Sequence, residues 1–104
     1  MKVNRDTTIK VLQELGIDRQ SLVAVEELAE LQKAITKAVR YPEYSTPPLR
    51  YIGVRSNLVE EMADVLIIMD TLSYYYRITD DEIQEIIQAK QQRAEKRLKE
   101  GELS

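Results

Sequence analysis

Apolar residues recur every three or four positions along almost the whole chain, a spacing that fits helices and does not fit alternating strands. The chain has 104 residues with only three glycines, and its three prolines all fall within residues 41–55. The pattern predicts a short helix over residues 6–15, ended by Gly16, and a long helix to residue 40 with Asp18 as its N-cap.

Two further helices are predicted after the proline-containing stretch. Residues 41–55 are predicted to form a loop, which is long enough to act as a lid or binding loop. A third helix is expected over residues 56–76. A fourth is expected to run to about residue 100 and stop near Gly101, because Thr79 and Glu82 have the spacing of a capping box.

The expected fold is therefore all-α: one domain over residues 1–104, with three long helices and a short N-terminal helix packed as a bundle. Apolar residues lie on more than one face of the long helices, so we expect oligomerisation to complete the bundle. Several faces of the expected core would then be closed by another subunit. The residues expected to be largely buried are Leu12, Leu15, Leu28, Leu31, Ile35, Leu58, Met62, Val65, Met69, Leu72, Ile83 and Ile87.

Composition excludes several classes of function. The chain has no cysteine and no histidine, which excludes disulfides, thiol nucleophiles, thiolate or imidazole zinc sites and Ser-His-Asp triads. A formal net charge of −3 disfavours a broad nucleic-acid-binding surface. The first residues lack the apolar core of a signal peptide, and no apolar run approaches the roughly 20 residues of a membrane span. We therefore expect a cytoplasmic protein that does not bind membranes.

Two acidic motifs match each other position by position. The segment VEELAEL covers residues 25–31, and VEEMADV covers residues 59–65. At about 100° per residue, Glu26 and Glu60 occupy equivalent positions that point away from the buried face of each helix. The motifs are thus equivalent in helical phase as well as in residue class.

The remaining acids of the two motifs are predicted to converge. The same helical phase places Glu27 and Glu61 at the edge of the buried face, with Glu30 and Asp64 beside them. If the helices pack antiparallel, the four carboxylates meet, although each pair about 4 Å apart costs on the order of 4 kcal/mol. Neither motif contains a basic residue. A hard cation held by oxygen ligands, Mg²⁺ or in its place Mn²⁺, would relieve the repulsion.

Two other interpretations of the motifs stay open. Glutamate is a good helix former, and such runs are common on solvated helix faces. The offset between the motifs, about 34 residues, is also the period of tetratricopeptide repeats. A further step of the same length reaches RAEKRLK, which has no matching pattern, so the repeat interpretation has little support.

The paired motifs resemble the MazG-like family of all-α nucleoside triphosphate pyrophosphohydrolases, whose signature is E-E-x-x-E followed by E-x-x-D. The matching segments are EELAE at residues 26–30 and EMAD at residues 61–64. The segment GIDRQSLVAVEELAELQKAI is also similar to the lead-in that is usual in the family, and the resemblance covers residues 16–98.

The resemblance implies a function as well as a fold. Glu27, Glu30, Glu61 and Asp64 would hold Mg²⁺. The reaction would be hydrolysis of an NTP or dNTP between the α and β phosphates, giving NMP and pyrophosphate in nucleotide-pool cleansing. The family also implies a homo-oligomer, either a dimer or a tetramer. Glu30 is the candidate catalytic base for the attacking water.

Candidate substrate-binding residues and competing functions complete the predictions. The residues that we expect to contact substrate, the basic ones at its phosphates, are Gln20, Lys37, Lys90, Arg93 and Arg97. One alternative function is phosphoribosyl-ATP pyrophosphatase, which uses the same metal chemistry. The other is a non-enzymatic helical module for oligomerisation or as an adaptor, whose acids are only solvated.

Overall fold

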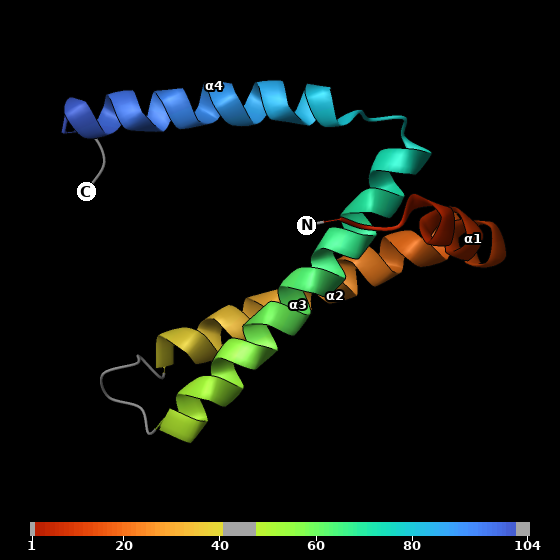
Figure 1. The fold of residues 1–104 in the computed structure, drawn as a ribbon, viewed down its shortest axis with the longest axis horizontal. Helices are drawn as coiled ribbons and strands as arrows, with labels where there is room; N and C mark the ends of the chain where they lie inside the picture. The colour runs from red at the N-terminus through yellow and green to blue at the C-terminus, as the bar shows by residue number, and fades with distance from the viewer. Residues whose placement is uncertain (1, 41–47, 102–104) are drawn as a thin grey trace.

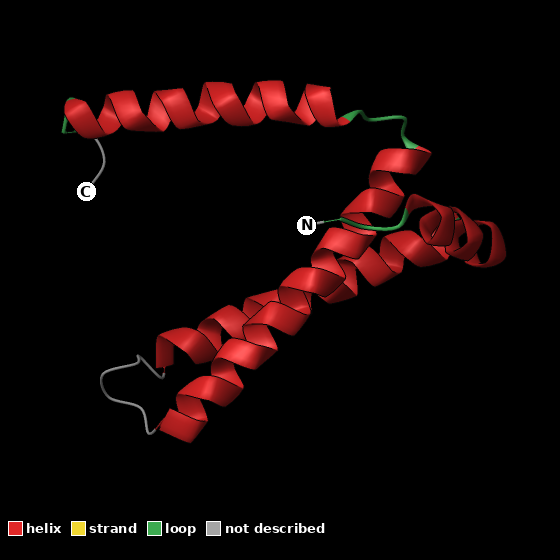
Figure 2. Ribbon diagram, viewed as in Figure 1, coloured by secondary structure: helices red, strands yellow, loops and turns green. Residues whose placement is uncertain are grey.

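The computed structural model describes residues 2–40 and 48–101, and this part of the chain is helical without a strand (Figures 1 and 2). The all-α class is confirmed. The three long helices have 24, 28 and 20 residues, and the short first helix has 11. In chain order the helices are α1 (Arg5–Leu15), α2 (Ile17–Arg40), α3 (Pro48–Tyr75) and α4 (Asp80–Lys99).

Helices α1 and α2 are joined at Gly16, whose backbone dihedral angles lie outside the right-handed helical region. Its φ of 82° is in the range that favours glycine, and its N–H donates to the carbonyl of Leu12. The end predicted for α1 is therefore confirmed. The N-cap predicted for α2 is wrong, because α2 begins at Ile17 and Asp18 lies inside its first turn. A carboxylate there still suits the positive end of the helix dipole.

Helix α3 begins at Pro48, eight residues before the predicted start. The prediction treated every proline as a loop residue, yet proline is favoured in the first turn of a helix, where its missing N–H costs nothing. Residues 48–55 of the predicted loop are therefore helical, and residues 41–47 lie outside the described part.

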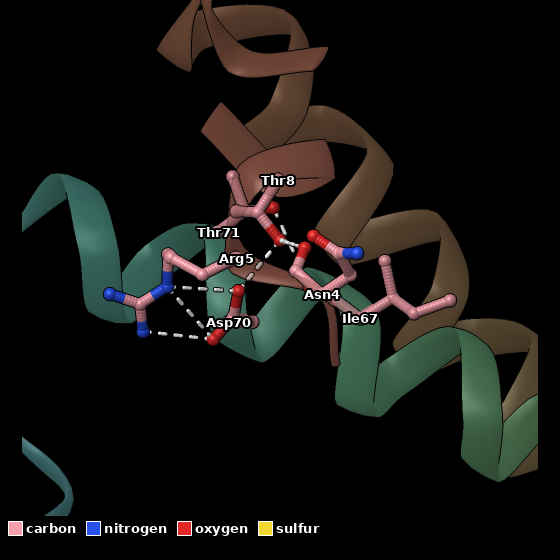
Figure 3. Close-up of polar contacts among 6 residues, drawn as sticks. All are labelled: Asn4, Arg5, Thr8, Ile67, Asp70 and Thr71. Carbon is pink, nitrogen blue, oxygen red and sulfur yellow. Dashed lines mark hydrogen bonds and ion pairs between the residues drawn. The ribbon is translucent and has the colours of Figure 1, made fainter. Parts of the chain in front are cut away.

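Helices α2 and α3 run side by side in opposite directions and supply the core (Figure 1). Their contact is built from small and β-branched side chains, since Ala24, Ala34, Val65 and Ile68 are buried. Alanine at two of these positions lets the helix axes approach closely. Thr71 is also buried, and its hydroxyl donates to the carbonyl of Ile67 one turn earlier at 3.5 Å (Figure 3).

Only one residue of the predicted core is fully buried within the single chain, namely Val65. Five residues are instead exposed on the chain as it stands: Leu28, Ile35, Met62, Met69 and Ile87. The remaining six are half-buried: Leu12, Leu15, Leu31, Leu58, Leu72 and Ile83. The single chain does not bury these five residues, and their burial by another subunit stays a prediction.

Asp70 joins α1 to α3 (Figure 3). Its carboxylate accepts from Arg5 Nη2 at 2.9 Å and from Arg5 Nε at 3.1 Å, and from the Thr8 hydroxyl at 2.6 Å. Thr8 is buried, and the hydrogen bond to Asp70 satisfies its hydroxyl group there. The hydrogen bonds from Arg5 and Thr8 favour the charged form and lower the pKa of Asp70 below its ordinary value of 3.8.

Replacing Asp70 by Asn should loosen α1 and cost about 1.5–3 kcal/mol in the free energy of unfolding, the scale of hydrogen bonds to a charged group. Because the folded pKa is lowered, this contribution is present above pH 3.8 and is lost as pH falls through the folded pKa. Urea unfolding of both proteins at several pH values measures the difference.

The matched control is Asp81→Asn, which removes the same charge from an exposed position on α4 and should change stability by no more than about 0.5 kcal/mol. A difference between the wild type and Asp70→Asn that stays constant below pH 3.8 would contradict the ion-pair explanation.

Helix α4 starts at the predicted capping box. The Thr79 hydroxyl accepts from the Glu82 N–H at 3.2 Å, and the Glu82 carboxylate accepts from the Thr79 N–H at 2.7 Å. Before it, the chain turns at Arg77, whose φ of 57° is left-handed. The helix then extends away from the others and packs against none of α1, α2 and α3 (Figure 1). None of the described helices is sufficiently long and apolar to span a membrane.

Candidate metal centre

Three carboxylates from two helices converge. Glu27 of α2 and Glu61 and Asp64 of α3 each place one oxygen so that all three oxygens lie within 4.8 Å of one another. Glu61 and Asp64 are three residues apart and so share one face of α3. The antiparallel pairing of α2 and α3 brings Glu27 opposite them. All three side chains are half-buried at the edge of the helix contact.

Partial desolvation and mutual repulsion disfavour the charged forms of Glu27 and Glu61. Partial desolvation and the nearby Asp64, which also hydrogen-bonds to it, raise the pKa of Glu27 above 4.5. Desolvation, Asp64 and Glu30 likewise raise the pKa of Glu61. The ion pairs among the described residues involve none of the three carboxylates of the group. Such a cluster favours either a bound proton or a bound cation.

The other acids of the two motifs lie outside this group. Glu30 is close enough to raise the pKa of both Glu27 and Glu61. Its own carboxylate forms an exposed ion pair with Lys33 at 3.3 Å. Glu26 and Glu60 are exposed and do not belong to the group, as their helical phase predicts. Of the four predicted ligands, three therefore meet in the structure.

A polar recess lies beside the carboxylates between α2 and α3. It has a volume of about 430 Å³, and Glu30, Lys37 and Asn57 are among its lining residues. Two further cations line it, Lys33 and Arg40. Lys33, Arg40 and Asn57 were not among the site residues predicted from the sequence. Helical spacing could have predicted Lys33 and Arg40, because they lie with Lys37 on the same face of α2 as Glu30.

The remaining predicted substrate residues lie elsewhere. Gln20 is buried and lines a separate apolar groove near α1, together with Thr8 and Thr71. Lys90, Arg93 and Arg97 lie on α4, which does not pack against α2 or α3. Within one chain, the structure therefore brings Lys37 alone of the five substrate candidates to the side of the site.

The donor set fits a hard divalent cation. Carboxylate oxygens are the ligands that Mg²⁺, Mn²⁺ and Ca²⁺ prefer, and this set does not by itself select among them. Three carboxylates would leave part of an octahedral shell to water or to a ligand, as is usual for protein-bound Mg²⁺. Position and chemistry together make Glu27, Glu61 and Asp64 the candidate metal centre.

Comparison with known proteins adds no family to this description: no protein-family model, no curated protein and no solved structure matches the chain.

Proposed function

We propose that the protein is a Mg²⁺-dependent hydrolase that cleaves nucleoside triphosphates between the α and β phosphates, releasing NMP and pyrophosphate. The observation that carries the proposal is the convergence of Glu27, Glu61 and Asp64 with no ion-pair partner among the described residues. The spacing of these acids resembles the MazG-like signature. The proposal includes a homo-oligomer and a role in removing unwanted nucleotides from the cellular pool.

The proposed ligands of Mg²⁺ are Glu27, Glu61 and Asp64. When bound there, Mg²⁺ would neutralise the charge that grows on the phosphate oxygens during the reaction. The carboxylates that would hold the cation come from two helices packed against each other, so they stand close together before the cation binds. The predicted fourth ligand, Glu30, is better suited to a different task, because its carboxylate lies at the border of the group.

Glu30 is the proposed general base. It takes a proton from the water that attacks the α-phosphorus, while the bond from that phosphorus to the bridging oxygen breaks and pyrophosphate leaves. Its carboxylate also pairs with Lys33 at 3.3 Å, in an exposed contact that leaves it open to solvent water. Lys37 and Arg40 line the recess next to it and offer positive charge to the departing phosphates.

The decisive experiment is a panel of NTPs, dNTPs and phosphoribosyl-ATP assayed with Mg²⁺, in which pyrophosphate and orthophosphate are measured separately. We expect pyrophosphate and the nucleoside monophosphate in equal amounts, and no activity after chelation. Preference for phosphoribosyl-ATP would identify the related pyrophosphatase instead. No hydrolysis of any substrate would favour the non-enzymatic helical module and reject the proposal.

A further inference from the structure

The recess beside the carboxylates carries more positive than negative charge. Among the described residues that line it, three are cations, Lys33, Lys37 and Arg40, and one is an acid, Glu30. Lys33 pairs with Glu30 at 3.3 Å, whereas neither Lys37 nor Arg40 forms an ion pair within the described part of the chain. The formal net charge of the whole chain is −3. The recess is therefore a local exception to that charge and is suited to an anion.

The three cations form a row that leads away from the carboxylates. Their spacing of four and then three residues puts them on one face of α2. At a rise of about 1.5 Å per residue, Lys33 follows Glu30 by roughly 4.5 Å along the helix axis. Lys37 and Arg40 follow Glu30 by roughly 10.5 Å and 15 Å. Side chains on a helix lean toward its N-terminus, so all three are directed back toward the carboxylates and keep this order.

Asn57 borders the same recess from α3. It lies about one helical turn before Glu61, and because α3 runs antiparallel to α2, that turn lies toward Lys37 and Arg40 (Figure 1). The Asn57 side chain is half-buried, and no hydrogen bond to its amide is found among the described residues. Its N–H groups are therefore available to donate to a ligand in the recess.

The helix dipole explains only part of this arrangement. Lys37 and Arg40 lie in the last turn of α2, where cations suit the negative end of the dipole. The dipole accounts neither for Asn57, which lies on α3, nor for Lys33, which lies two turns before the end of α2. A chain of phosphates accounts for all four residues, because its oxygens accept from cations and amides along its whole length.

The row of cations is longer than a triphosphate requires. If the α-phosphate lies at the carboxylates, as the proposed function requires, the β and γ phosphates occupy the near part of the row beside Lys33 and Lys37. Arg40 lies almost a turn further along α2 and so stays beyond the γ phosphate. The recess can therefore hold a further phosphate.

We propose, on the basis of the proposed hydrolase function, that Arg40 binds a fourth phosphate, so that nucleoside tetraphosphates are substrates and bind more tightly than triphosphates. The planar guanidinium group of Arg40 can donate to two phosphate oxygens at once. Cleavage still occurs between the α and β phosphates: water adds to the α-phosphorus, Glu30 takes its proton, and the remaining chain leaves with the bridging oxygen. A nucleoside tetraphosphate therefore gives NMP and inorganic triphosphate.

Steady-state kinetics with the triphosphate and the tetraphosphate of one nucleoside test the proposal. In the wild type, the KM of the tetraphosphate should be lower by about fivefold or more, the scale of one charge-assisted contact. Arg40→Gln should remove most of this difference. Lys37→Gln should raise both KM values by the same factor, because Lys37 lies beside phosphates that the two substrates share.

Arg19→Gln is the matched control, since it removes the same charge from an exposed position near the opposite end of α2. This variant should keep the difference in KM. Equal KM values for the two substrates in the wild type, or a difference that Arg40→Gln leaves intact, would overturn the proposal. Equal losses in Arg19→Gln and Arg40→Gln would also overturn it, because net charge rather than the recess would then set the affinity.

Calorimetry with inorganic phosphates separates the fourth-phosphate site from the proposed hydrolase. With Mg²⁺ present, the wild type should bind inorganic triphosphate more tightly than pyrophosphate, and Arg40→Gln should bind the two alike. If this difference is found and no nucleotide is hydrolysed, the hydrolase is rejected and the recess is retained as a polyphosphate site. If nucleoside triphosphates are hydrolysed but the wild type binds the two anions alike, the hydrolase is retained and the fourth-phosphate site is rejected.

Discussion

Replacing Glu61 by Gln is expected to reduce hydrolysis of the preferred triphosphate by at least about 100-fold, the scale of removing one group that stabilises charge in a transition state. Gln keeps the shape of Glu but not its charge, so the cation loses a ligand. The metal-free variant should be at least as stable as the metal-free wild type, because it lacks the charge whose desolvation and repulsion by Asp64 raise the pKa of Glu61. Steady-state kinetics and urea unfolding without metal measure the two effects.

Two neighbours serve as controls for this variant. Glu26→Gln and Glu60→Gln remove the same charge from the same motifs, but both residues are exposed and lie outside the group of three carboxylates. Each should retain activity within about threefold of the wild type, since neither touches the cation. Loss of activity in Glu60→Gln equal to that in Glu61→Gln would show that net charge rather than ligation controls the rate. Full activity in Glu61→Gln would remove the metal centre from the mechanism.

The sequence was sufficient for the number and order of the helices and for the phase of the acids. Helical spacing depends only on which residues are apolar, and Gly16 and the Thr79–Glu82 capping box mark helix ends through local backbone chemistry. The convergence of Glu27, Glu61 and Asp64 followed from helical phase plus antiparallel packing. Rules that depend only on neighbouring residues therefore predicted the side of each helix on which the acids lie.

The sequence failed where a residue has two structural roles or where packing is not local. Pro48 can sit in a loop or begin a helix, and only the start of α3 decides between the two. The Asp70–Arg5 contact joins residues 65 positions apart, and no periodicity predicts such a pair. The direction of α4 also depends on packing rather than on neighbouring residues. The sequence therefore cannot show that Lys90 and Arg93 lie on a helix that does not reach the site within one chain.

Adding Mg²⁺ should raise the melting temperature of the wild type by about 10 °C or more at a hundredfold excess over its dissociation constant. A cation that binds only the folded state at that concentration contributes about 2.7 kcal/mol, and 1 kcal/mol shifts a domain of about 100 residues by roughly 4–8 °C. A chelator should reverse the shift. Differential scanning fluorimetry at one fixed protein concentration measures it without any substrate.

The same measurement on variants separates a specific site from a general effect of salt. Glu61→Gln should show a much smaller shift, because two carboxylates hold a divalent cation less tightly than three. Glu60→Gln should shift as the wild type does, although its net charge equals that of Glu61→Gln. Equal shifts in all three proteins would mean that Mg²⁺ only screens the acidic surface. The carboxylates would then be a solvated cluster, whatever the activity assay gives.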